Sequence, residues 1–140
     1  MSGELQGHVV MYKATTRAIE VTVRPQYLPD QSDPSKPQYV WAYQVRIENK
    51  GAVTVQLRSR HWKITDALGR QQEVRGPGVV GKTPMLRPGE VFEYTYGTPL
   101  ATPSGFMSGT YQMVSESGEN FDIEIPTFSL DTPGAERRLN

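Results

Sequence analysis

Apolar and polar side chains alternate along most of this chain with a period of two residues. The alternation is clear in segments 19–24, 41–47 and 92–96. The 11 prolines and 13 glycines are scattered, and only Pro37–Pro77 is a long interval without proline inside it. Long helices therefore have little room, and the pattern is typical of strands that bury one face only.

Polar turns divide the chain into about seven such strands, an arrangement that favours an antiparallel β-sandwich. A closed β-barrel is the alternative. Neither an internal repeat nor a second domain is evident, so we expect a single domain over residues 1–140. Its ordered core should span about 15–130, between a flexible N-terminal arm and a flexible C-terminal tail. The turns are expected at residues 29–38, 49–51, 66–71, 87–90 and 115–120.

Two local features refine this expectation. Val53, Val55 and Leu57 are apolar on odd numbers, whereas Trp62 and Ile64 are apolar on even numbers. A strand keeps one buried face unless a residue is inserted, so the change of phase predicts a β-bulge or bend within Arg58–His61. The phase of the strand at 41–47 predicts that Trp41 lies in the core. We expect Pro126 to interrupt the last strand.

Composition excludes several function classes. The 15 basic and 15 acidic residues cancel, which argues against a general nucleic-acid or membrane-surface binder. With no cysteine, the chain cannot form disulfides, thiolate metal sites or a cysteine nucleophile. The apolar run 9–12 is too short for the core of a signal peptide, and no run approaches the ~20 residues of a membrane span. We therefore expect a soluble cytoplasmic protein with no nucleic-acid or membrane partner.

The segment 76–84, GPGVVGKTP, matches two nucleotide-binding patterns at once. A dinucleotide fingerprint needs a strand before the glycines, a helix after them and an acidic residue about 20 positions on. Residues 96–103 supply no acid, and Pro84 with Pro88 leaves room for one helical turn at most. We therefore reject both the dinucleotide and the P-loop interpretation.

A weaker possibility remains for this segment. Backbone N–H groups near glycines can form an anion-binding nest on any fold, and two flanking cations would assist. Pro77 has no N–H to donate, so we favour a purely structural role in a tight bend with close backbone approach. The candidate anion-binding residues are Arg75, Gly76, Gly78, Gly81 and Lys82.

Other candidate sites are poorer. The chain has two histidines, His8 and His61, but no G-x-S-x-G motif whose serine a histidine could activate. We therefore expect no catalytic residue and no cofactor. An acidic stretch is the one place where a hard cation could bind, although its spacing fits no EF-hand and a solvated strand face is the favoured interpretation. These weak metal candidates are Glu116, Glu119, Asp122 and Glu124.

The most distinctive segments of the chain are RHWKITD, GPGVVGKTP, PGEVFEYTYG, TPSGFMSGTYQM and FDIEIPTFSL. With these segments, about residues 18–130 resemble the ApaG family, also called CorD. The family pattern G-x-G-V-V-G-x-x-P puts Lys82 and Thr83 at variable positions, which supports an accidental P-loop match. The resemblance implies a fibronectin type III-like or immunoglobulin-like sandwich and a genetic link to cobalt tolerance and magnesium efflux. Similar domains in eukaryotic F-box proteins and a polymerase-delta-interacting protein look like interaction modules.

Two functional hypotheses follow. The first is a non-enzymatic protein-interaction or regulatory module, which binds an unidentified protein partner, or a second copy as a homodimer, through loops or a strand edge. The alternative is a sensor of small anions or nucleotide phosphates such as pyrophosphate, using the glycine loop 75–82. A weak enzyme is a distant third.

Overall fold

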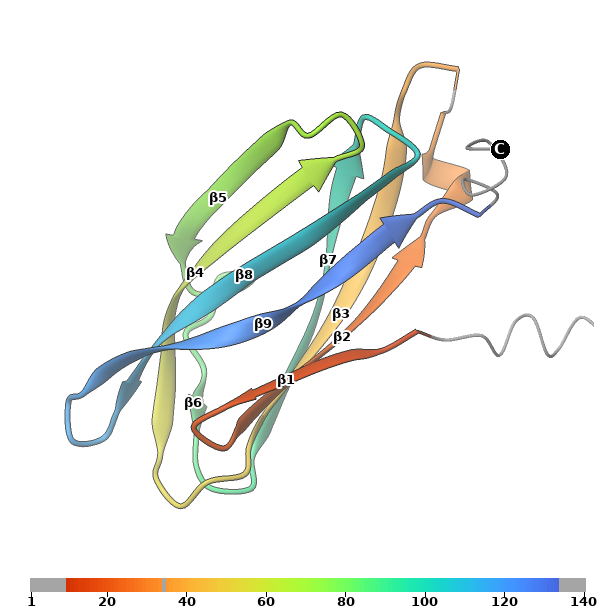
Figure 1. The fold of residues 1–140 in the computed structure, drawn as a ribbon. Coiled ribbons are helices and arrows are strands. Elements are labelled where there is room, and N and C mark those ends of the chain that lie inside the picture. The colour runs from red at the N-terminus through yellow and green to blue at the C-terminus, as the bar shows by residue number, and fades with distance from the viewer. Residues whose placement is uncertain (1–9, 34, 134–140) are drawn as a thin grey trace, which may run out of the picture.

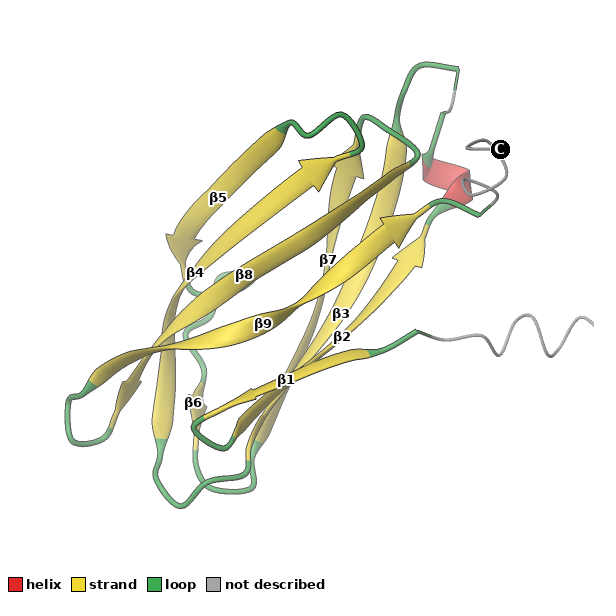
Figure 2. Ribbon diagram, in the orientation of Figure 1, coloured by secondary structure: helices red, strands yellow, loops and turns green. Residues whose placement is uncertain are grey.

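The computed structural model describes residues 10–33 and 35–133, and it shows two antiparallel sheets packed face to face (Figure 1). The expected β-sandwich is confirmed, with nine strands in the described residues in place of about seven. The only helical element in this part of the chain is the short 3-10 helix Pro29–Gln31 (Figure 2). His8 and most of the expected flexible arm and tail lie outside the described residues.

The two sheets form separate layers, which Figure 1 shows one behind the other. The first sheet has the order β1-β2-β3-β7, and the second has the order β5-β4-β8-β9 with β6 paired to β4. The strands of the first sheet are β1 (Tyr12–Thr16), β2 (Ile19–Tyr27), β3 (Tyr39–Asn49) and β7 (Val91–Leu100). Those of the second are β4 (Val55–Asp66), β5 (Gln71–Pro77), β6 (Met85–Leu86), β8 (Ser104–Ser115) and β9 (Asn120–Asp131).

The core lies between the sheets and is made by the inward residues of each strand. In β3 every second residue is buried from end to end, as the alternation predicted. Trp41 is only 5% exposed, so its predicted place in the core is confirmed. The Phe128 ring of β9 lies 6.0 Å from the rings of both Tyr43 and Trp62, so one aromatic cluster joins the two sheets.

Two bulges reset the buried face of a strand. The β4–β8 register shifts between Leu57 and Ser59, so the predicted bulge is confirmed and Arg58 is the inserted residue. A second bulge lies in β9, where Gly109 pairs with Ile125 but Met107 pairs with Phe128. The expectation that Pro126 interrupts the strand is therefore wrong: β9 runs through it, because a bulge accommodates a residue without an N–H.

Three further expectations differ from the structure. Val53 lies in an exposed turn, and the strand begins at Val55. The turn expected at 49–51 lies after Asn49, which is the last residue of β3 and whose buried side chain donates to the carbonyls of Val53 and Leu86. The first strand, β1, begins at Tyr12, ahead of the core boundary that we placed near residue 15. Its residues are intermediate or exposed, so the burial signal in the sequence is weak there.

The packing gives a first prediction. Trp41→Ala should lower the free energy of unfolding by about 3–5 kcal/mol, because it leaves a large cavity in the core. Urea unfolding of this variant measures the loss, and Leu68→Ala, at an exposed turn position, is the control that should change it by less than about 0.5 kcal/mol. A loss below about 1 kcal/mol for Trp41→Ala would contradict the packing described.

Candidate functional site

The glycine loop closes with a tight turn after β5. Val79 and Lys82 exchange backbone hydrogen bonds of 2.8 and 2.9 Å, and the two residues between them, Val80 and Gly81, have φ of +43° and +78°. Positive φ at both central positions is the signature of a type I′ turn. Gly78 has φ +61°, and a Cβ there would overlap the Lys82 carbonyl. The structural role that we favoured for these glycines, a tight bend with close backbone approach, is confirmed.

Gly76 has a different structural role from Gly78 and Gly81. It pairs with Arg60 of β4, and a Cβ at Gly76 would lie 3.1 Å from both Nη1 and Nη2 of that guanidinium. Nη1 of Arg60 donates to the carbonyl oxygens of Pro77 and Gly78, each at 2.9 Å. The absent side chain of Gly76 therefore makes room for an arginine that holds the loop by its carbonyls.

The five candidate anion-binding residues do not form a cradle of free donors. The N–H groups of Gly78, Val79 and Lys82 already donate to backbone carbonyls at 2.8–2.9 Å. The side chains of Arg75 and Lys82 are exposed, and Arg75 lies 3.6 Å from the Glu73 carboxylate. This geometry disfavours a nest for phosphate.

A pocket of about 350 Å³ lies beside the loop, between β7 and the inner face of β4. Sequence reasoning missed its one charged residue, Arg60. The signal was available, because the phase that buries Trp62 after the bulge also turns Arg60 inward. The pocket is lined by Tyr43, Arg60, Trp62, Pro77, Val79, Val80, Gly81, Tyr94 and Tyr96.

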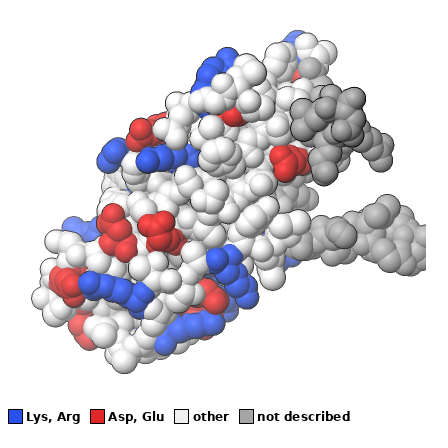
Figure 3. All heavy atoms as spheres, in the orientation of Figure 1, with Lys and Arg blue, Asp and Glu red and all other residues white. Residues whose placement is uncertain are grey.

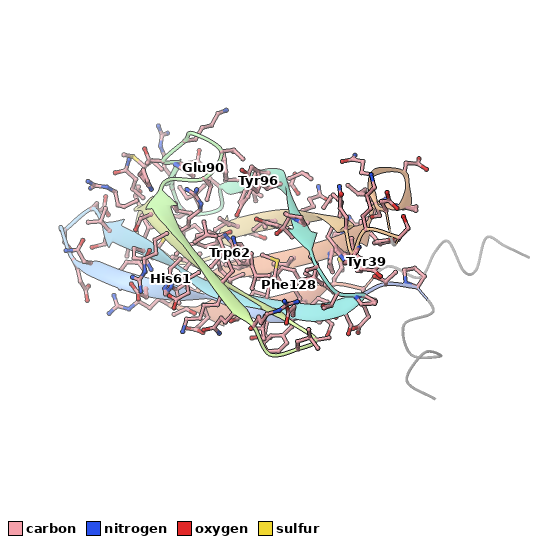
Figure 4. All side chains as sticks on the ribbon, turned by 90° about the horizontal axis from the view of Figure 1, so that it is seen from above. Tyr39, His61, Trp62, Glu90, Tyr96 and Phe128 are labelled. Atoms are coloured by element: carbon pink, nitrogen blue, oxygen red, sulfur yellow. The ribbon has the colours of Figure 1, made fainter. Side chains whose placement is uncertain are left out.

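Four of the nine residues that line the pocket are aromatic. The Tyr43 ring lies 5.2 Å from that of Trp62 and 6.3 Å from that of Tyr96. Figure 4 shows Trp62 and Phe128 in the middle of the molecule, with Tyr96 and His61 nearer its surface. Tyr94 is buried and Tyr96 is 57% exposed, so β7 supplies both the floor and the rim of the pocket.

Burial favours the neutral form of three phenols here, those of Tyr43, Tyr94 and Tyr111, by raising their pKa values. Burial raises the pKa of Tyr94 to about 12, while hydrogen bonding to Tyr111 and the Arg60 charge act in the opposite direction. Burial also raises the pKa of Tyr43, and Tyr94 and Tyr96 add to this effect. The pKa of Tyr111 is raised well above its ordinary value for the same main reason, since its hydroxyl is buried against that of Tyr94.

The remaining sequence candidates lie apart from this pocket. His61 faces away from the core on β4, and its Nε2 lies 2.7 Å from Oε1 of Glu73. This hydrogen bond lowers the pKa of Glu73. The arrangement is that of a partly exposed histidine hydrogen-bonded to a surface carboxylate, and no hydroxyl of a described residue bonds to the ring.

The acidic stretch does not converge on one point. Glu119 accepts a 2.9 Å hydrogen bond from Arg17, which lowers the carboxylate pKa. Glu116, Asp122 and Glu124 are exposed. Figure 3 shows acidic and basic side chains interspersed on the face it draws. Within residues 10–33 and 35–133, no three histidine, aspartate or glutamate side chains are placed to hold a metal ion.

Comparison with known proteins places this geometry in a family. The family model described as the ApaG domain matches residues 29–115, which include β3 to β8 and the whole pocket lining. The chain belongs to the ApaG family. Curated ApaG proteins of Rhodospirillum centenum and Paramagnetospirillum magneticum are each 65% identical to it over 130 residues, 93% of this chain and all of theirs.

Solved structures of relatives share the fold. A Bordetella pertussis protein named ApaA is 53% identical and covers 89% of this chain and 98% of its own, with a TM-score of 0.80. The C-terminal domain of wzt aligns with a TM-score of 0.52 at 9% identity, a likeness of fold alone. Among the residues that the ApaG chain's structure describes, no helix is long and apolar enough to cross a membrane.

The turn geometry predicts a contrast between two substitutions. Gly78→Val should cost about 1–3 kcal/mol of stability, because a β-branched residue resists positive φ and its Cβ meets the Lys82 carbonyl. Lys82→Ala should change the free energy of unfolding by less than about 0.5 kcal/mol, because the side chain is exposed. Urea unfolding compares the two, and equal effects would show that the loop does not depend on its glycines.

The buried phenols predict an alkaline transition. Because the folded pKa of Tyr94 is about 12 and an unfolded tyrosine titrates near 10, its stabilising effect is complete below pH 10 and is lost between about pH 10 and 12. A rise of this size corresponds to about 2–3 kcal/mol. Urea unfolding from pH 8 to 12 should show the fall, and Tyr94→Phe should reduce it. Titration of all seven tyrosines near pH 10 in the folded protein would contradict this account.

Proposed function

We propose that this ApaG-family protein is a non-enzymatic interaction module that binds an extended segment of a protein partner along the free edge of β7. β7 has ten residues and one neighbour in its sheet, β3. A strand with one unpaired side offers backbone donors and acceptors to an incoming segment. Its exposed apolar side chains, Val91 and Tyr96, would add contact area.

The other sheet edges are less suited to this role. β1 and β9 lie against each other, and the Glu124 N–H donates to the Thr16 hydroxyl at 3.1 Å. β5 carries exposed polar and charged side chains along most of its length, and such residues discourage edge pairing. In β7 the one charged residue, Glu93, lies 3.6 Å from Arg46 of β3. The free edge of β7 is therefore the observation that carries this proposal.

The proposal can also accommodate the family's genetic link to cobalt tolerance and magnesium efflux. We propose that any contribution to cobalt tolerance and magnesium efflux passes through the bound protein partner, in the cytoplasm. The engagement of Glu119 with Arg17 and the exposure of the other acidic residues support this over direct ion binding.

Photocrosslinking in the native cell tests the proposal. A benzophenone side chain at Tyr96 should capture a protein, whereas the same group at Leu68, a turn position that is more exposed than Tyr96, should not. Thr95→Lys places a charge on the edge strand and should reduce capture, and Gln72→Lys on the edge of β5 is the matched control. A captured second copy of this chain would identify a homodimer through the same edge.

Two outcomes would contradict the proposal. One is capture at Leu68 as strong as capture at Tyr96. The other is capture at Tyr96 that Thr95→Lys and Gln72→Lys reduce equally, since the partner would then not depend on the edge of β7.

A further inference from the structure

Arg60 is a cation on the inward face of a strand. The bulge at Arg58 puts it in phase with buried Trp62, and its partners in register are Gly76 on one side and Tyr111 on the other. Among its contacts with described residues, the guanidinium donates only through Nη1, to the carbonyls of Pro77 and Gly78. Within the described residues, no carboxylate lies within 4.0 Å of the guanidinium, and neither Nη2 nor Nε donates to a protein atom.

The groups around Arg60 leave one more donor without a partner. The Tyr94 hydroxyl is engaged with Tyr111, but the Tyr43 hydroxyl makes no hydrogen bond to a described residue. Tyr43 lines the same pocket as Arg60. Neither these guanidinium nitrogens nor the Tyr43 hydroxyl is among the buried polar atoms that lack a partner, so they open into the pocket, where one anion could accept from both residues.

We propose that this pocket is a carboxylate-binding site, and that its occupant is an aspartate or glutamate side chain of the partner segment paired with β7. This inference rests on the proposed function. A carboxylate carries one negative charge, and it accepts two parallel N–H bonds from an arginine fork. Arg60 is the single charged residue of the lining, and three loop amides are already used, which fits one carboxylate better than a phosphate.

The position of the pocket relative to β7 connects the two proposals. Tyr94 and Tyr96 lie on the same face of β7, and both line the pocket. In an added strand, the residue opposite such a position points to the same side of the sheet. An acidic side chain opposite these tyrosines would therefore point toward Arg60, while the backbone of its strand pairs with β7.

Two blocked peptides test the site by amide and indole NMR. Acetyl-Thr-Val-Glu-Val-Thr-amide should shift the Trp62 indole and β7 amide resonances and saturate, and the peptide with glutamine in place of glutamate should bind about tenfold more weakly. Arg60→Met should abolish the difference between the peptides, and Arg75→Met should preserve it. Because Arg60 also holds the loop, Tyr43→Phe serves as a second variant that keeps the packing and should weaken only the glutamate peptide.

Each other outcome overturns part of the account. If both peptides shift β7 equally, the edge-binding proposal stands and the carboxylate site is wrong. If sodium acetate saturates the Trp62 shift but neither peptide affects β7, the pocket binds carboxylates and the partner strand is wrong. If pyrophosphate saturates the same resonances at lower concentration than acetate or the glutamate peptide, the site is selective for phosphate and the carboxylate assignment is wrong.

Discussion

The hydrogen bonds from Arg60 to the carbonyls of Pro77 and Gly78 link the bulge in β4, the glycine loop and the aromatic pocket. The bulge at Arg58 turns the guanidinium inward, and Gly76 leaves space for it. The loop that Arg60 holds forms one wall of the aromatic pocket, and β7 forms another. The loop conformation and the candidate binding site thus share one partly buried cation.

The same contact distinguishes the loop 76–84 from the two nucleotide-binding motifs that its sequence matches. In those motifs, glycines expose backbone N–H groups to phosphate at the start of a helix. Here a strand leads into the glycines and a type I′ turn closes the loop. The loop presents the carbonyl oxygens of Pro77 and Gly78 to Arg60, while the N–H groups of Gly78, Val79 and Lys82 donate to backbone carbonyls. The letters of a motif predict its chemistry only when the flanking elements are those that the chemistry requires.

The sequence predicted what period-two burial controls: the sandwich, the core position of Trp41 and the bulge at Arg58. The sequence-based prediction was wrong about the start of the ordered core, because the residues of β1 are weakly buried, and about a strand break at Pro126, because a bulge tolerates the proline. Only part of the candidate site could be predicted from the sequence. The glycines drew attention to the loop, but the importance of Arg60 depends on its pairing with Gly76 and on the approach of β7, contacts between residues distant in the sequence.

A double-mutant cycle tests the central contact most directly. Urea unfolding of Arg60→Met, Gly76→Val and the double variant gives the coupling free energy between the two positions. Because a side chain at Gly76 would displace the guanidinium, the account predicts a coupling of at least about 1 kcal/mol, with Gly76→Val less harmful once Arg60 is replaced. Additive effects within about 0.5 kcal/mol would contradict the claim that Gly76 exists to admit Arg60.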